Sequence, residues 1–172
     1  MAIYDNDGTI DYELGKVYDN DGTANYQIGK VYDNDGTVNS LIYSADITIF
    51  NAGVWDSSIT PKYEGYYEGK AYQSGNNVVL YIYWAWYSGG EVLFSFDTTG
   101  YSTFKVTLTA DNSKPPITVK VGSVKKSVNT TGTTVSLDIS ALNGVQSCSI
   151  KYANGEYNNG QDKCYISKIY AS

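Results

Sequence analysis

The sequence predicts an all-β protein: an antiparallel β-sandwich of the jelly-roll kind, preceded by a small extension of β-hairpin repeats. Residue usage is the first sign, because the chain has 17 glycines but 3 prolines, and its runs are dominated by Thr, Ser, Val, Ile and Tyr, which favour strands and tight turns. A repeat at the N-terminus is the second. The third is a series of segments in which apolar and polar residues alternate, without an amphipathic helix between them.

The repeat has a period of 14 residues. It reads IYDNDGTIDYELGK over residues 3–16, VYDNDGTANYQIGK over 17–30 and VYDNDGTVNS from Val31, and the third copy decays after Ser40. An Asp-Gly turn between two short alternating segments predicts one small hairpin per copy. Hairpins of this size bury little surface alone, so they must stack on each other, on the main domain or on neighbouring chains. We assign residues 1–43 to these repeats, with an oligomerising or stalk role, and 44–172 to the sandwich.

Clustered carboxylates in the repeats raise the alternative of a calcium site. The weak candidate ligands are Asp5, Asp7, Asp19, Asp21, Asp33 and Asp35. An EF-hand loop needs Asp two residues before the DxDG, where this chain has Ile3, Val17 and Val31, so the EF-hand pattern fails. Turn formation by Asp-Gly explains the motif, and we expect no metal or other cofactor, with calcium as the alternative.

The main domain contains about nine strand-like segments after residue 46. The clearest alternation places Phe104, Val106, Leu108 and Ala110 on one face, and segments 117–121 and 135–139 repeat the pattern. Predicted turns separate them at Gly75–Asn76, Gly89–Gly90, 111–116, Thr131–Gly132, Asn143–Gly144 and 154–162. One buried and one solvated face per strand predicts two packed antiparallel sheets.

Two cysteines, Cys148 and Cys164, open the last two predicted strands. If these strands form a hairpin around residues 154–163, the cysteines lie at opposite ends, roughly 17 Å apart at about 3.3 Å per residue. A disulfide needs Cα atoms within about 7 Å, so we expect free, half-buried thiols. A disulfide would remain possible if the two strands belonged to different sheets or paired in another register.

Composition excludes several function classes. No histidine is present, so neither a Ser-His-Asp or Cys-His catalytic set nor a histidine-ligated zinc or haem site can form. A net charge of -6, with 12 scattered basic residues, argues against nucleic acid. No apolar run approaches the roughly 20 residues of a membrane span. The opening MAIYDNDG lacks the basic and apolar regions of a secretory signal, so we expect a soluble chain and no membrane partner.

Among enzymes the composition favours a glycosidase that uses two carboxylates, because that chemistry needs only two Asp or Glu side chains at a defined separation. The best pair is Glu64 and Glu68 in YEGYYEG, which on an extended strand would stand about 13 Å apart. This exceeds both the ~5 Å of retaining and the ~6.5 to 9.5 Å of inverting enzymes. We therefore interpret them as solvated edge carboxylates and predict no enzyme. The sequon at Asn129 is interpreted as a turn.

Aromatic residues concentrate between Trp55 and Tyr87. In VVLYIYWAWY, Val78, Leu80, Ile82, Trp84 and Trp86 share one face, which we assign to the core, and Val79, Tyr81, Tyr83, Ala85 and Tyr87 share the other. Aromatic faces stack against sugar rings and are frequent at protein interfaces. The candidate ligand-binding residues are Tyr81, Tyr83, Tyr87, Tyr63, Tyr66, Tyr67 and Trp55, to which Tyr72 could add. The alternative is that these tyrosines pack under loops or against the repeats.

Segments from Tyr101 to the C-terminus read YSTFKVTLT, TTVSLDISALNG, CSIKYANG and KCYISKIYAS. They resemble the C-terminal β-sandwich modules of tail-associated minor structural proteins, receptor-binding-like proteins in phages and prophages of gut Firmicutes, over roughly the last 70 residues. The Tyr-Asp-x-Asp-Gly repeat, followed by Ile-Gly-Lys in its second copy, resembles small hairpin-repeat modules from the same bacteria and their phages. The resemblance implies a jelly-roll-like adhesion or carbohydrate-binding domain, trimeric as such proteins often are, with no catalytic residue to carry over.

Together these observations predict a non-catalytic adhesion module in a phage tail or bacterial surface protein. Its expected partner is a surface glycan or protein receptor, and its expected state is a homo-oligomer, a trimer before other states. Its expected location is the virion, or else the cell surface or extracellular space. The alternative is a purely structural virion component whose aromatic face is buried in subunit contacts.

Overall fold

The computed structural model describes residues 4–6, 11–13, 18–20, 25–27, 30–34, 39–44, 46–83, 87–113, 115–153 and 161–172, with side chains from residue 46 onward. It divides the chain into two compact units, one of residues 1–47 with Ser172 and one of residues 48–171. The boundary that the sequence predicts, between residues 43 and 44, stays a proposal. In the described residues, no helix is long and apolar enough to cross a membrane.

The described residues of the N-terminal unit form three antiparallel hairpins, and an extension of hairpins was predicted from the repeats. The pairs are β1 (Tyr4–Asn6) with β2 (Asp11–Glu13), β3 (Tyr18–Asn20) with β4 (Asn25–Gln27), and β5 (Lys30–Asn34) with β6 (Asn39–Ser44). The register repeats with the sequence, because Tyr4 pairs with Glu13 and Tyr18, 14 residues on, pairs with Gln27. Each copy therefore folds onto itself as a local hairpin.

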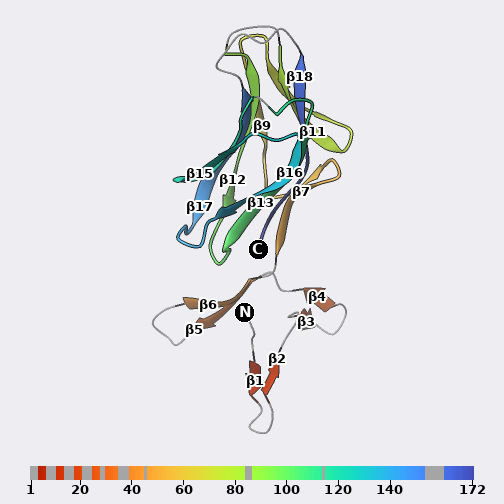
Figure 1. The fold of residues 1–172 in the computed structure, drawn as a ribbon. Coiled ribbons are helices and arrows are strands. Elements are labelled where there is room, and N and C mark those ends of the chain that lie inside the picture. The colour runs from red at the N-terminus through yellow and green to blue at the C-terminus, as the bar shows by residue number, and fades with distance from the viewer. Residues whose placement is uncertain are drawn as a thin grey trace. The chain divides into compact units, whose positions relative to one another are not determined.

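The larger unit is an antiparallel sandwich of two sheets, as predicted (Figure 1). The seven-stranded sheet has the order β10-β11-β18-β13-β16, and β7 pairs with β18 and with β8. Its strands are β7 (Ile47–Asn51), β8 (Val54–Trp55), β10 (Lys70–Ser74), β11 (Asn77–Ile82), β13 (Thr103–Ala110), β16 (Gly132–Asp138) and β18 (Asp162–Ala171). The five-stranded sheet runs β15-β14-β17-β12-β9. Its strands are β9 (Lys62–Tyr66), β12 (Gly89–Asp97), β14 (Ile117–Val121), β15 (Val124–Val128) and β17 (Val145–Ala153).

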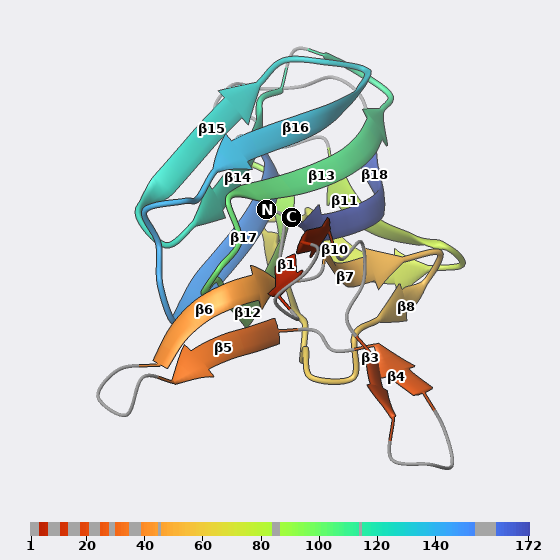
Figure 2. The same ribbon diagram turned by 90° about the horizontal axis from the view of Figure 1, so that it is seen from below.

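The two sheets approach each other along both sides of the sandwich. On one side β15 lies beside β16, and the Lys126 ammonium donates to the Ser136 carbonyl at 3.2 Å (Figure 2). On the other side β10 contacts both β9 and β12. The sandwich is therefore nearly closed, which protects its edge strands from pairing with other chains.

The core forms where the alternating pattern predicts it. Phe104, Val106, Leu108 and Ala110 of β13 are buried, and the same holds for the apolar residues of β14 and β16. A chain of aromatic rings joins the two inner faces: Phe94 lies 6.3 Å from Phe104, which lies 5.7 Å from Phe96. Burial of these rings supplies much of the hydrophobic stabilisation of the sandwich.

Three sequence-based expectations need correction. Gly89 and Gly90 do not form a turn but open β12, where a side chain at Gly89 would meet β17 and one at Gly90 would meet the backbone of β10. The described part of the larger unit has twelve strands, β7 to β18, because short strands such as β8 and β15 show no alternation. Residues 154–160, part of a predicted loop, lie outside the described residues.

The third correction concerns the last two strands. β17 and β18 do not pair with each other: β17 pairs with β12 and β14, whereas β18 pairs with β11 and β13. The predicted hairpin is wrong because the two strands belong to different sheets. Cys148 and Cys164 are free thiols, as expected, but they are buried rather than half-buried. Burial raises the pKa of each thiol to about 12, with Asp111 contributing at Cys164.

Candidate functional site

The structure separates the predicted aromatic site residues into four places. Trp55 and Tyr63 lie at the margin of the core, Tyr66 on the outer face of the five-stranded sheet, Tyr81 on the outer face of the seven-stranded sheet, and Tyr67 with Tyr87 on two connections between strands. Tyr83 follows β11 beside Tyr81. The predicted core residues Trp84 and Trp86 lie outside the described residues.

Trp55 and Tyr63 contact the core and each other. The Trp55 ring packs 4.9 Å from Phe50 and 5.4 Å from Phe94, and its Nε1–H donates to the Tyr63 hydroxyl at 3.1 Å. The Tyr63 hydroxyl in turn donates to Gln73 Oε1 at 3.3 Å. Burial raises the pKa of Tyr63. This arrangement closes one edge of the core, so these two rings present little free aromatic surface.

Tyr66 belongs to a polar cluster. Its hydroxyl donates to a carboxylate oxygen of Glu91, and the Lys151 ammonium lies 4.2 Å from the centre of its ring. Burial and the hydrogen bond to Glu91 raise its pKa. Because Tyr66 pairs with Gly89 across the strands, no side chain from β12 covers its ring at that position. The ring is held by a hydrogen bond at its tip and a cation over its face.

Carboxylates do not assemble as a catalytic pair from YEGYYEG. Glu64 lies in β9 and Glu68 in the turn after it, because the strand ends at Tyr66. The prediction that both stand on one extended strand is wrong. Glu64 instead lies opposite Glu91 of β12. Its Oε1 lies 2.6 Å from Lys62 Nζ, in an ion pair. Each of these two carboxylates thus already has a partner within the sheet.

Tyr81 and Tyr83 lie at one end of the outer face of the seven-stranded sheet. Their ring centres are 5.9 Å apart, and Lys163 of β18, directly opposite Tyr81 in the register, places its ammonium 5.8 Å from the Tyr81 ring. Tyr72 of β10 is exposed on the same face, diagonally across from Tyr81. Val78, Leu80 and Ile82 face the core, as the alternation predicts.

Tyr67 and Tyr87 are the most exposed aromatic residues that the structure describes. Their side chains are 74% and 58% exposed, although they come from different connections, β9–β10 and β11–β12. Their ring centres lie 6.5 Å apart. Both residues have positive φ, 48° and 58°, a region that L-residues other than Gly, Asn and Asp seldom occupy. Two strained backbones that present neighbouring exposed rings are a feature typical of functional positions.

A set of glycines holds these two connections in place. A side chain at Gly69 would meet the backbone of Gly89, and one at Gly90 would meet the carbonyl of Lys70. The β9–β10 turn is therefore packed backbone to backbone against the start of β12. The other connection is closed by the Tyr83 N–H, which donates to the hydroxyl of buried Ser88 at 2.9 Å. Backbone packing thus positions the connection that carries Tyr67, and the Tyr83–Ser88 hydrogen bond joins the two ends of the connection that carries Tyr87.

A shallow open groove of about 370 Å³ lies on the five-stranded sheet. Its lining residues are Ser58, Thr60, Lys62, Leu93, Phe94, Ser95, Ser147 and Cys148. The groove holds hydroxyl groups and one lysine, but none of the predicted aromatic residues. It is therefore a separate feature from the tyrosine positions.

The structure leaves the calcium alternative as a prediction. No group of three or more acidic or cysteine side chains that could hold a metal ion occurs within the ranges that the structure describes. Asp7, Asp21 and Asp35 lie outside those ranges, and for Asp5, Asp19 and Asp33 the strand backbone alone is described.

Sequence reasoning missed the basic residues that accompany the tyrosines on the seven-stranded sheet. In β18, the segment KCYISKIYAS buries both Ile166 and Ile169, three positions apart, and the register shifts between Thr107 and Leu108 of β13. Strict alternation cannot bury both isoleucines, so this spacing was the signal of a β-bulge. The bulge brings Lys168 and Tyr170 to the same outer face as Lys163.

Comparison with known protein families finds no family that matches this chain, and none of the curated proteins matches it. Solved structures do. A family 29 carbohydrate-binding module complexed with mannohexaose has a TM-score of 0.52 at 10% identity, over 76% of this chain and 92% of that one. A second variant of that module has a TM-score of 0.51 at 13% identity, over 74% and 91%. A third structure, also a family 29 module, has a TM-score of 0.50 at 11% sequence identity, over 74% of this chain and 90% of that one. The larger unit of this chain therefore has the β-sandwich fold of carbohydrate-binding modules.

Proposed function

We propose that this protein is a non-catalytic carbohydrate-binding module, and that Tyr67 and Tyr87 form the centre of its binding site. The exposed, closely spaced pair of rings carries the proposal. Aromatic rings bind sugars through their faces, which pack against the C–H groups of a pyranose ring. A pair that is already held in place loses little conformational entropy when it binds.

The backbone strain supports the same proposal. Positive φ at a tyrosine costs of order 1–2 kcal/mol, and a fold that needed only a turn at these positions would be more stable with Gly or Asn. Strain of this kind persists where the surrounding structure imposes it, and it concentrates at ligand-binding positions. Tyr81 and Tyr83, which reach the same β11–β12 connection, extend the proposed surface onto the sheet.

The fold that this chain shares with solved carbohydrate-binding modules also supports the proposal. One of them is a complex with mannohexaose, so the sandwich in that protein binds a chain of sugars. Two carboxylates of the five-stranded sheet already have partners, Glu64 with Lys62 and Glu91 with Tyr66, and this argues against a catalytic role for them. Of the predicted site residues we keep Tyr67, Tyr87, Tyr81 and Tyr83 in the proposed surface. We leave out Trp55 and Tyr63, which lie at the margin of the core, and Tyr66, which lies on the outer face of the five-stranded sheet.

A glycan array with the full chain tests the proposal. We expect the wild type to bind a defined subset of glycans, and we expect a variant with Tyr67→Ala and Tyr87→Ala to lose at least ten-fold in signal. The matched control is Val145→Ala, which shortens a 73% exposed side chain opposite Asp97, at the end of β12 that is remote from Tyr87; this variant should bind as the wild type does. If the wild type binds no glycan, or if the tyrosine variant binds equally well, the proposal is wrong.

We further propose that the module is displayed on a phage tail or a bacterial surface, as a homo-oligomer and as a trimer before other states. Three hairpins of the N-terminal unit support this, because strand pairs this small need a further surface on which to pack. The competing role is that of a structural virion component whose tyrosines are buried between subunits. Labelling of tyrosines in the assembled particle separates the two: a binding module keeps Tyr67 and Tyr87 reactive, and a structural component protects them.

A further inference from the structure

Lysines and tyrosines share the outer face of the seven-stranded sheet. The register places Lys70, Tyr81 and Lys163 side by side on β10, β11 and β18, and Lys105 of β13 beside Tyr170 of β18. The bulge in β18 adds Lys168 to this face. We call the set of Lys70, Tyr81, Lys105, Lys163, Lys168 and Tyr170 the lysine–tyrosine face.

Each of its two tyrosine rings is accompanied by at least one ammonium group. Lys163 Nζ lies 5.8 Å from the centre of the Tyr81 ring. Tyr170 has two such neighbours, Lys168 at 4.5 Å and Lys105 at 5.4 Å. These distances lie within the range of about 6 Å over which a cation and an aromatic ring attract each other. The face therefore presents a positive charge next to each flat apolar surface.

The lysine–tyrosine face is basic, whereas the whole chain is acidic. Four of the 12 basic residues lie here, in a chain with a net charge of -6. Within the described part of the chain, none of these four lysines forms an ion pair. The Lys62–Glu64 ion pair lies on the other sheet. Three carboxylates at its margins accept hydrogen bonds: Asp111 from the Lys163 N–H, Asp138 from the Ser140 N–H and Asp162 from Asn112 Nδ2.

We infer that the lysine–tyrosine face binds an anionic polysaccharide whose sugars carry carboxylate groups. Such a polymer has a ring to pack on a tyrosine and, on the same sugar, a carboxylate to pair with the adjacent ammonium. Binding releases the lysine from the tyrosine ring and gives it a stronger, charge-assisted partner. The inference rests on the proposed function: it names the ligand chemistry and extends the proposed surface from Tyr81 along the seven-stranded sheet.

The first test compares one polymer in two charge states. Isothermal titration of the full chain uses polygalacturonate, the same polymer after reduction of its carboxyl groups, and a single-stranded oligonucleotide. We expect polygalacturonate to bind at least ten-fold more tightly than the reduced polymer, with an affinity that falls as salt rises, because charge pairs at a surface are screened. The oligonucleotide should bind weakest, because the rest of the chain is acidic.

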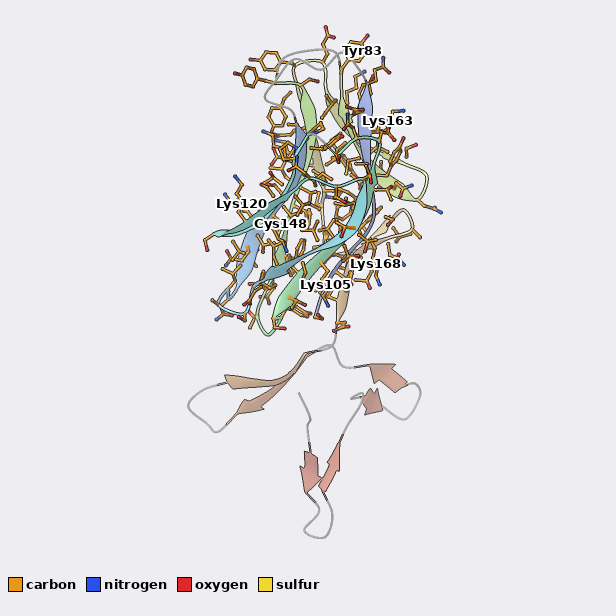
Figure 3. All side chains as sticks on the ribbon, in the orientation of Figure 1. Tyr83, Lys105, Lys120, Cys148, Lys163 and Lys168 are labelled. Atoms are coloured by element: carbon orange, nitrogen blue, oxygen red, sulfur yellow. The ribbon has the colours of Figure 1, made fainter. Side chains whose placement is uncertain are left out.

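The second test removes the same amount of charge from two different faces of the sandwich. A variant with Lys163→Gln and Lys168→Gln should lose at least ten-fold in affinity for polygalacturonate and keep its melting temperature. The matched control is Lys120→Gln with Lys125→Gln, which removes the same charge from the outer face of the five-stranded sheet. Figure 3 shows Lys163 and Lys168 on one side of the sandwich and Lys120 on the other. The control should bind within two-fold of the wild type.

Three results would overturn the inference: equal affinity for the acidic and reduced polymers, an equal loss in the control variant, or tighter binding of the oligonucleotide. Binding of neutral glycans that depends on Tyr67 and Tyr87 would then leave the proposed function standing. If no glycan of either kind binds, both the inference and the proposed function are wrong.

Discussion

Tyr67 and Tyr87 combine an exposed ring with a backbone that their residue type disfavours. Asn tolerates positive φ better than Tyr, so Tyr67→Asn and Tyr87→Asn should each raise the free energy of unfolding, by up to about 1 kcal/mol, while they remove the proposed binding surface. Urea unfolding measures the effect. Lower stability in both variants would show that the rings are structural and that the strain has another origin.

Cys148 and Cys164 make the stability of the sandwich sensitive to alkaline pH. Burial raises the pKa of both thiols to about 12, whereas in the unfolded chain they titrate near 9.0. Between pH 9 and 12 the unfolded chain therefore loses protons that the folded chain keeps, and the free energy of unfolding falls as pH rises. The expected fall is at most about 1.4 kcal/mol per pH unit for each thiol.

Urea unfolding at pH 8, 9, 10 and 11 checks this dependence. Cys148→Ala costs stability at every pH because it leaves a cavity, but the decline with pH should be shallower than in the wild type. Both thiols should also resist alkylation in the folded protein at pH 8 and react after denaturation. A decline as steep in the variant as in the wild type would refute the role of Cys148.

At the scale of elements, the contact of β10 with β9 and β12 depends on glycines. Gly90→Ala would drive a methyl group into the Lys70 carbonyl, and backbone on both sides leaves no flexible atom to move. We expect a loss of about 1–3 kcal/mol or more in the free energy of unfolding.

Gly132 in β16 is the matched control. A Cβ there would lie 3.6 Å from Thr109 Cγ2, an ordinary contact. Gly132→Ala should therefore change stability by no more than about 0.5 kcal/mol. The two variants are compared by thermal and urea unfolding, and equal effects would mean that the β10–β12 contact is not tightly packed.

Strands were predictable from sequence where one face is buried and the other solvated. β13, β14 and β16 have this property, and their buried residues follow the alternation. Pairing was not predictable in the same way. β17 and β18 are neighbours in sequence with similar patterns, yet they lie in opposite sheets, since an alternating strand fits either inner face equally well.

For the whole molecule, the distribution of tyrosines could be predicted in part. The sequence identified the aromatic segment, and Tyr81 lies on the face opposite to Val78 and Leu80 as expected. The strand ends at Ile82, however, so Tyr87 lies on the β11–β12 connection and not on the strand face that the alternation predicted. That Tyr67 meets Tyr87 follows from the contact between two connections 20 residues apart, which no local pattern records. The lysines beside Tyr170 were missed because a bulge interrupts the period of β18.

The oligomeric state is the property of the whole chain that the hairpin repeats should determine. Light scattering after size-exclusion chromatography should show a defined oligomer for the intact chain and a monomer for a chain that starts at Ser44. The reason is that hairpins with strands of three to six residues bury little surface unless they pack on another copy. Two monomeric species would instead show that the repeats are no assembly device.

Titration calorimetry of the wild type and of the Y67N/Y87N double variant, with the glycan that gives the strongest array signal, tests the central claim most directly. Because Asn suits both backbone positions, the variant should remain folded, so a change in affinity reports on the rings alone. The account predicts at least a ten-fold loss of affinity, about 1.4 kcal/mol, with an unchanged or raised melting temperature. An unchanged affinity in the folded variant would contradict it.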